Sequence, residues 1–117
     1  MRIGIDGRLW NESGVGRYIR NLVKYLQILD KNNDYVLFCR SKDYESIKYQ
    51  VLSIKWMIVP SDIRWHTIKE QLKFPSILKK ENLDLVHFPY FSVPIFYNKP
   101  FIVTIHDLIH QHFQMRR

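Results

Sequence analysis

Three small residues stand where the first apolar run of the chain gives way to a long periodic segment. Ser13, Gly14 and Gly16 precede or open a stretch in which apolar residues recur every three or four positions. We therefore predict a strand over residues 3–5, a glycine loop and a helix that begins near Val15. A helix N-terminus presents unpaired backbone N–H groups and a positive dipole end, and glycine lets a ligand approach the main chain. This chemistry suits an anionic group, typically a phosphate.

The glycines alone leave a second interpretation open, because a tight turn after the first strand would need the same residues. The spacing also departs from the dinucleotide fingerprint G-x-G-x-x-G, since three larger residues follow Gly16 and the loop over residues 7–13 is too long. A nucleotide-dependent oxidoreductase is therefore disfavoured. Arg17 could contact a phosphate, but a cation in the first helical turn opposes the dipole, so a solvated side chain is the default interpretation.

A histidine and an aspartate follow the last apolar run of the chain. His106 and Asp107 come directly after residues 101–105, and His110 and His112 extend them to the pattern H-D-x-x-H-x-H. This spacing fits no standard zinc pattern and no cysteine accompanies it, so we predict no metal site.

Composition indicates one globular domain. The 117 residues are 46% hydrophobic and 15% aromatic, which argues against disorder and for an α/β fold. Cys39 lies inside an apolar run and has no second cysteine with which to pair, so we predict a buried thiol in a reducing compartment. With no export signal and no apolar run approaching 18 residues, we expect a cytoplasmic protein.

The net charge of +7 favours anionic partners such as nucleotides, phosphates or acidic lipids. The basic residues are spread along the chain and form no compact block with interleaved aromatic residues, so nucleic acid is not an expected partner.

Four further apolar runs predict the strands that must position these residues, over 35–39, 54–59, 83–87 and 101–105. A short helix is expected within residues 40–50. A longer one is expected from Arg64, with an apolar face formed by Trp65, Ile68 and Leu72. Pro75 should kink that helix or begin a new one that runs to about Glu81.

Strands that alternate with helices, and whose apolar runs lack alternation, predict a parallel sheet with right-handed crossovers. The fold class is therefore α/β, a Rossmann-like parallel sheet of about five strands in the order 3-2-1-4-5 with helices on both faces. Ligands of such sheets lie beyond the carboxyl ends of the strands, next to the first strand. The glycine loop, the loop over residues 89–100 and His106 should all meet at that edge.

Two stretches of the chain resemble a known family. MRIGIDGRLWNESGVGRYIRNLVKYL and DLVHFPYFSVPIFYNKPFIVTIHDLI are similar to the N-terminal domain of family-4-like GT-B glycosyltransferases, a group that includes many bacterial mannosyltransferases. The resemblance implies half of a GT-B fold. It also implies a retaining enzyme that transfers a hexose from a nucleotide-sugar to a glycan or a lipid-linked acceptor, with no metal or other cofactor.

The same resemblance implies roles for single residues. Gly14 and Gly16 would approach the donor diphosphate, and His106 would be the catalytic residue near the transferred sugar. From the residues themselves, Tyr90 could form an acceptor wall with Phe91, Phe96 and Tyr97 or could pack its loop down. Asp107 is placed on the acceptor side, although it could instead brace the next segment. His87 ends a predicted strand at the same edge, where we expect a structural histidine with satisfied hydrogen bonds.

The chain departs from the family in length. The donor-binding second lobe is absent, and residues 1–117 correspond to an N-terminal, acceptor-side domain that is incomplete at its C-terminus, so we expect no catalysis by this chain alone. Two alternatives stay open: a non-catalytic module that pairs with a separate donor-binding chain, and a freestanding binder of nucleotides or phosphates. A homodimer would cover the exposed sheet edge. Peripheral contact with the inner face of the membrane is expected if the acceptor is lipid-linked, and four lysines of the predicted second long helix could make it: Lys69, Lys73, Lys79 and Lys80.

Overall fold

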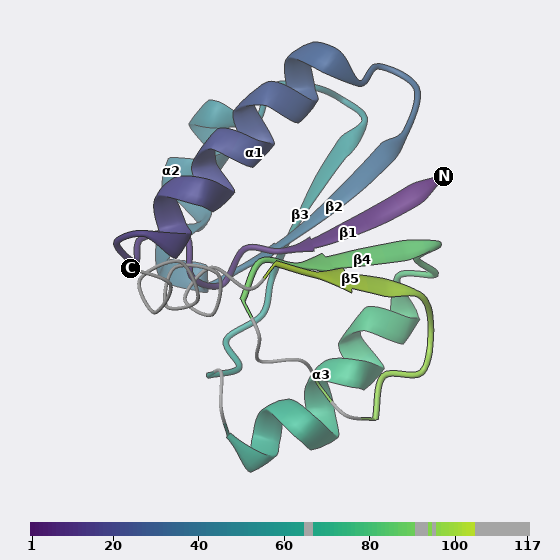
Figure 1. Cartoon of the computed structure of the whole chain (residues 1–117). Helices are drawn as coiled ribbons and strands as arrows, with labels where there is room; N and C mark the ends of the chain where they lie inside the picture. The colour runs from purple at the N-terminus through teal and green to yellow at the C-terminus, as the bar shows by residue number, and fades with distance from the viewer. Residues whose placement is uncertain (65–66, 91–93, 95, 105–117) are drawn as a thin grey trace, which may run out of the picture.

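The computed structural model describes residues 1–64, 67–90, 94 and 96–104, and the structural statements below refer to these residues (Figure 1). The elements in chain order are β1 (Arg2–Asp6), α1 (Val15–Leu29), β2 (Asp34–Cys39), the 3-10 turn η1 (Ser41–Asp43), α2 (Tyr44–Gln50), β3 (Trp56–Pro60), α3 (Ile68–Lys80), β4 (Leu85–Phe88) and β5 (Phe101–Val103). The five strands form one parallel sheet in the order β3-β2-β1-β4-β5. The predicted strand order is confirmed.

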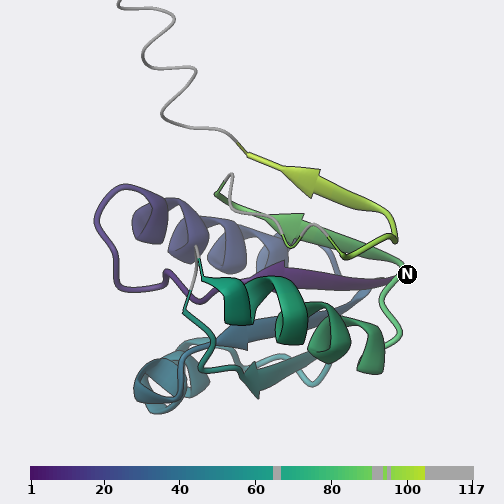
Figure 2. The same ribbon diagram turned by 90° about the horizontal axis from the view of Figure 1, so that it is seen from below.

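Helices cover both faces of this sheet, with α1 and α2 on one side and α3 on the other (Figures 1 and 2). The burial of strand β2 on both faces explains why its sequence is apolar without alternation. Its residues Tyr35, Leu37 and Cys39 join the core under α1 and α2, whereas Val36 and Phe38 join the core under α3. Successive side chains of a strand point to opposite faces, so a strand buried on both faces must be apolar at every position. The predicted α/β Rossmann-like fold class is confirmed.

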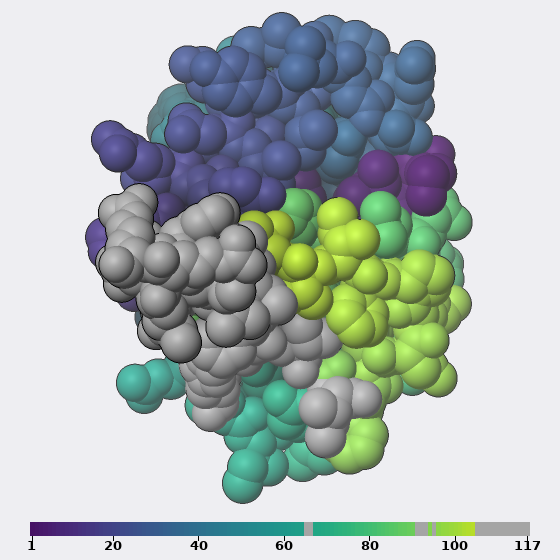
Figure 3. All heavy atoms as spheres, viewed as in Figure 1, coloured from purple at the N-terminus to yellow at the C-terminus, as the bar shows by residue number. Residues whose placement is uncertain are grey.

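Strand β1 lies at the centre of the sheet and pairs with β2 on one side and β4 on the other. In the space-filling view, N-terminal residues in purple lie between the blue segment and the green and yellow segments (Figure 3). Because all pairings are parallel, the carboxyl ends of the strands meet at one edge of the sheet. The loop that follows β1 therefore leaves from the middle of that edge.

Two predicted strand boundaries are wrong by about two residues. Strand β3 begins at Trp56, because Trp56 N donates to the carbonyl of Ser53 in a turn that leaves Ile54 99% exposed. Strand β4 begins at Leu85 rather than at residue 83. The preceding Asp84 uses its carboxylate, not its carbonyl, to accept a hydrogen bond of 2.7 Å from Arg2 N.

The predicted apolar face of the second long helix is also wrong. Ile68 and Leu72 of α3 are 79% and 63% exposed, whereas Phe74 and Leu78 are fully buried against the sheet. Trp65, the third residue of that predicted face, lies outside the described residues. The buried face also includes Glu70, whose charge is compensated by a residue far away in the sequence. Periodicity scored from apolar residues alone could not include a buried glutamate.

Helix α3 begins at Ile68 and continues through Pro75 to Lys80. Of the two predicted alternatives, a new helix that begins at Pro75 is therefore wrong. The helix gives up the backbone hydrogen bond that a proline cannot donate. Pro75 is buried on the same face of α3 as Phe74 and Leu78. The predicted stop is confirmed, because Asn82 adopts a positive φ of 53° just after the helix ends.

Cys39 is fully buried at the end of β2, and this predicts an unreactive thiol. Burial, reinforced by the carboxylates of Asp43 and Asp62, raises the pKa of Cys39 to about 11. The thiolate is the reactive form, so a disulfide reagent at mildly alkaline pH should react about a hundredfold more slowly with the native protein than with the urea-unfolded chain.

The same shift has a consequence for stability. An unfolded thiol loses its proton near its ordinary pKa, before the folded one does, so the free energy of unfolding should fall as pH rises from about 8.5 towards 11. Comparison with Cys39→Val isolates this contribution from that of other groups. Equal rates of reaction of Cys39 with the disulfide reagent in the native and unfolded states would contradict the predicted unreactive thiol.

Candidate functional site

The loop after β1 ends in a helix N-terminus without a side-chain cap. Gly14 occupies the N-cap position of α1 with φ 56° and ψ −83°, and the first turn contains no acidic residue. The carbonyl of Gly14 accepts the first helical bond from Tyr18 N at 3.1 Å. Within the described part of the chain, no residue accepts a hydrogen bond from the backbone N–H of Val15, Gly16 or Arg17. These donors and the positive dipole end make this turn a suitable place for an anion.

Glycine is favoured at the two positions of this turn for different physical reasons. A Cβ at Gly14 would meet no atom within 4 Å, but the positive φ there favours glycine. A Cβ at Gly16 would lie 2.6 Å from the carbonyl oxygen of Trp10 and 2.9 Å from that of Leu9. Gly16 is therefore required for the close passage of the loop against α1, whereas the open space beside Gly14 leaves the main chain accessible to a ligand.

A small hollow lies beside this helix N-terminus. Its volume is about 190 Å³, and it is lined by Leu9, Glu12, Ser13, Val15 and Tyr90. Four of these residues come from the glycine loop and the start of α1, and Tyr90 comes from the segment after β4. The structure thus brings the predicted acceptor-side tyrosine and the predicted phosphate loop to one cavity. The predicted His106 and Asp107 lie outside the described residues.

A polar cluster joins α1 to the carboxyl ends of the neighbouring strands. His87 Nε2 at the end of β4 lies 2.8 Å from Thr104 Oγ1, just beyond β5, and 3.5 Å from the hydroxyl of Tyr18 on α1. The Tyr18 hydroxyl and Thr104 Oγ1 are 3.3 Å apart. The hydrogen bonds of His87 agree with the predicted structural histidine. They also tie the end of β5 to the helix that begins at the glycine loop.

A buried ion cluster holds the other end of the glycine loop, and sequence reasoning did not find it. The Arg8 side chain is 2% exposed and forms two hydrogen bonds with Asp6, of 2.9 and 2.7 Å, and one with Glu70 Oε2 of 2.6 Å. It also donates to the carbonyl of Ile63 at 2.7 Å, and its guanidinium lies 3.9 Å from the ring centre of Phe74. Arg8 thereby connects the loop to β1 and α3.

Electrostatics favour the charged form of this arginine. Burial by itself would lower the pKa of Arg8, but the carboxylates of Asp6 and Glu70 outweigh burial and raise the pKa above its ordinary value. In the sequence, Asp6 and Arg8 stand two residues apart, which is a weak signal. Nothing local marks Glu70, 62 residues from Arg8, as the second partner.

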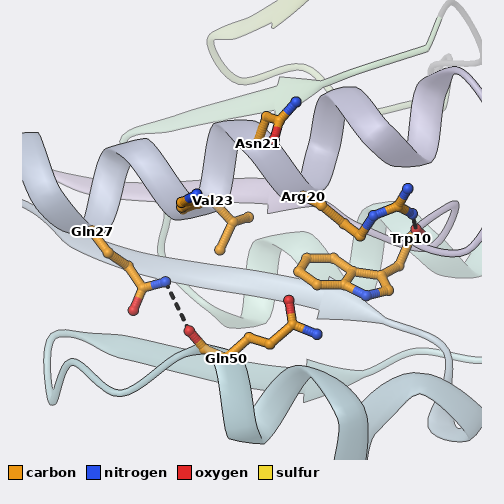
Figure 4. Close-up of a pocket in the computed structure, with 7 residues that line it drawn as sticks. Trp10, Arg20, Asn21, Val23, Gln27 and Gln50 are labelled. Atoms are coloured by element: carbon orange, nitrogen blue, oxygen red, sulfur yellow. Dashed lines mark hydrogen bonds between the residues drawn. The ribbon is translucent and has the colours of Figure 1, made fainter.

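A larger groove runs between α1 and α2 (Figure 4). It has a volume of about 440 Å³ and is lined by Trp10, Arg20, Asn21, Val23, Lys24, Gln27 and Gln50. The guanidinium of Arg20 donates to the carbonyl of Trp10 at 2.5 Å. This arginine holds the loop against α1.

The described residues contain no group of three or more histidine, cysteine, aspartate or glutamate side chains arranged to hold a metal ion. The site offers instead backbone amides at a helix N-terminus, an adjacent cavity and one exposed cation, Arg17. These groups can bind an anion and orient a neighbouring polar ligand.

Comparison with known proteins gave one informative result. The family model described as Glycosyltransferase Family 4 matches residues 13–117, which is more than half of the chain. The comparison with curated proteins and the comparison with solved structures gave no significant match. The match begins at Ser13, directly before the uncapped turn, and covers the candidate site from there on.

Proposed function

Because the chain belongs to glycosyltransferase family 4, we propose that it forms the acceptor-side lobe of a retaining, nucleotide-sugar-dependent enzyme that transfers a hexose to a glycan or lipid-linked acceptor. One observation carries the proposal: the uncapped start of α1, with Gly14 in open space, shares a cavity with Tyr90. In this proposal the amides of Val15 and Gly16 face the donor diphosphate, and Tyr90 faces the acceptor.

A second lobe is required by this mechanism. The groups at the site bind and orient, and among the described residues that line the hollow Glu12 is the one carboxylate. In a two-lobed transferase the reaction takes place in the cleft between lobes, so we propose that this chain is inactive until a donor-binding lobe faces it. His106 remains the proposed catalytic residue, on the strength of the family resemblance, and Asp107 remains a proposed acceptor-side residue.

The backbone amides of Val15, Gly16 and Arg17, which we call the amide site, can be tested for anion binding without a second lobe. We expect inorganic pyrophosphate and nucleoside diphosphates to shift the backbone NMR signals of Val15, Gly16 and Arg17 with a dissociation constant in the millimolar range or tighter. Arg17→Gln should weaken pyrophosphate binding by about tenfold, because it removes a charge-assisted contact. Lys24→Gln, two turns further along α1, serves as the matched control and should leave the affinity unchanged.

Three results would speak against the amide site. These are an absence of binding at millimolar pyrophosphate, signal changes confined to lysines elsewhere, and equal effects of the two substitutions. Persistent binding with nucleotide-dependent affinity but no transfer would favour the alternative of a freestanding nucleotide binder.

Transfer itself needs a different experiment. The coding sequence after residue 117 and the neighbouring genes should be searched for a second Rossmann-like lobe, and that lobe should be co-expressed with this chain. We expect labelled hexose to pass to an acceptor only when both lobes are present. Transfer by either lobe alone would contradict the proposed division of labour, and assembly of the two lobes without transfer would favour a non-catalytic pairing module.

A further inference from the structure

Apolar side chains gather at the end of α1 that lies farthest from the glycine loop. Tyr25, Ile28 and Leu29 on its last turns are 54%, 58% and 78% exposed. The end of α2 and the segment after it add Tyr49, Leu52 and Ile54, which are 80%, 81% and 99% exposed. We call the surface formed by Tyr25, Ile28, Leu29, Tyr49, Leu52 and Ile54 the apolar end.

Hydrogen bonds hold the two halves of the apolar end side by side. Gln27 Nε2 donates to the carbonyl of Gln50 at 3.1 Å, and Gln27 Oε1 accepts from Leu52 N at 3.1 Å (Figure 4 shows the first of these). In Figure 1 the end of α1 and the link from α2 to β3 lie together at the top of the molecule. The exposed side chains therefore belong to one surface and not to two separate loops.

The two halves also share a sequence pattern. Residues 24–31 read KYLQILDK and residues 48–55 read KYQVLSIK, so each segment begins with Lys-Tyr, ends with lysine and presents aliphatic residues between. The four lysines Lys24, Lys31, Lys48 and Lys55 thus border the apolar side chains. Asp30 is the one acidic residue of the two segments, and its carboxylate accepts hydrogen bonds from Tyr35 and Asn33. Outside the two segments, the exposed carboxylate of Asp34 lies 4.0 Å from Lys55 Nζ.

We propose that the apolar end docks on a bilayer that contains anionic phospholipids. Exposed aliphatic side chains bordered by lysines match such a surface. The aliphatic side chains enter the headgroup region, and the lysine ammonium groups extend towards the phosphates. The two tyrosines have an apolar ring and a polar hydroxyl, which suits the same boundary.

The charges and the geometry disfavour other occupants of the apolar end. Two copies of this chain would bring two sets of four lysines face to face, and like charges across an interface are unfavourable. Along α1 the apolar end lies about 16 Å (Tyr25) to about 22 Å (Leu29) from Gly14, so it does not line the hollow where a donor-binding lobe would face this chain. No helix among the described residues has the length and apolar character to cross a membrane.

The inference is independent of the proposed transferase role, and its test uses no nucleotide. The full chain is sedimented with vesicles of phosphatidylcholine alone and of phosphatidylcholine mixed with phosphatidylglycerol in equal parts. We expect binding to the mixed vesicles, with an affinity that falls steeply as salt is added. Leu52→Ser/Ile54→Ser should weaken this binding at least tenfold, because it removes two side chains that the headgroup region would bury.

The fold supplies a matched control. Ile68→Ser/Leu72→Ser makes the same chemical change on exposed residues of α3, which lies on the other face of the sheet, and should leave vesicle binding unchanged. Thermal unfolding of both variants should match the parent chain, since all four side chains are exposed. Lys48→Gln/Lys55→Gln should weaken the preference for anionic vesicles, because it removes two of the four bordering lysines.

Three outcomes would overturn the proposal. They are no binding to mixed vesicles, loss of binding in the α3 variant but not in the Leu52/Ile54 variant, and equal affinity for neutral and anionic vesicles. Sedimentation that shows a dimer in the parent chain and a monomer in Leu52→Ser/Ile54→Ser, without vesicle binding, would assign the apolar end to a second copy instead.

Discussion

Arg8→Met is expected to lower the free energy of unfolding by about 3–5 kcal/mol, as observed when one member of a buried ion cluster is removed. The carboxylates of Asp6 and Glu70 would lose a partner at 2.7 and 2.6 Å while only 8% and 0% of these residues is exposed to water. The carbonyl of Ile63 would lose its donor as well. Urea unfolding followed by circular dichroism measures the loss.

Two further variants keep this prediction testable if Arg8→Met fails to fold. Glu70→Gln retains shape and a hydrogen-bonding oxygen, and should cost about 1–3 kcal/mol. Lys55→Met removes a lysine whose ion pair with Asp34 is 4.0 Å long and exposed on both sides, so it should change stability by less than about 0.5 kcal/mol. Equal effects of Arg8→Met and Lys55→Met would show that the buried cluster does not stabilise the fold.

Gly16→Ala is expected to destabilise the protein by about 2 kcal/mol, which is typical of overpacking. A glycine-to-alanine change in a compatible helical position usually stabilises a protein by roughly 0.4–1 kcal/mol. The sign reverses because the new methyl group would lie within 3 Å of the carbonyl oxygens of Trp10 and Leu9. Backbone atoms cannot rotate away, so the loop must move relative to α1. Pyrophosphate binding at the start of α1 should weaken together with stability.

Gly14→Ala distinguishes crowding from backbone strain. Its methyl group would meet no atom within 4 Å, but the positive φ of 56° should cost about 1 kcal/mol. Amide signals of Leu9 and Trp10 should move in Gly16→Ala and stay in place in Gly14→Ala. A Gly16→Ala variant as stable as the parent chain, with unchanged signals at Trp10, would refute the close passage of loop and helix.

The strand order was predictable because apolar runs that alternate with helical segments indicate a parallel sheet with right-handed crossovers. Residues 35–39 are apolar at every position, and only a strand buried on both faces requires that. The helix over residues 15–29 was predictable for a similar reason, since its apolar residues follow the helical period and its glycines precede it. These features depend on neighbours in sequence, which is the information that a single chain offers.

The face of α3 was not predictable, because it depends on a partner remote in sequence. Glu70 is a polar residue on any local scale, and it is buried only because Arg8 arrives from the loop after β1. With Glu70 on the inside, Ile68 and Leu72 are left outside. The candidate site shows the same division. The meeting of the loop after β1 with Tyr90 in one hollow followed from the strand order, whereas the ion cluster that fixes the loop did not.

The central position of β1 has a consequence for the order of events during synthesis. One edge of β1 can pair with β2 once about 39 residues have been made, but its other edge must wait for β4, whose first register pair joins Ile3 to Leu85. Until then the first strand of the nascent chain keeps an open hydrogen-bonding edge. Contacts of such long sequence separation form slowly. We therefore expect newly made chains to need protection from strand-to-strand association until residue 88 has left the ribosome.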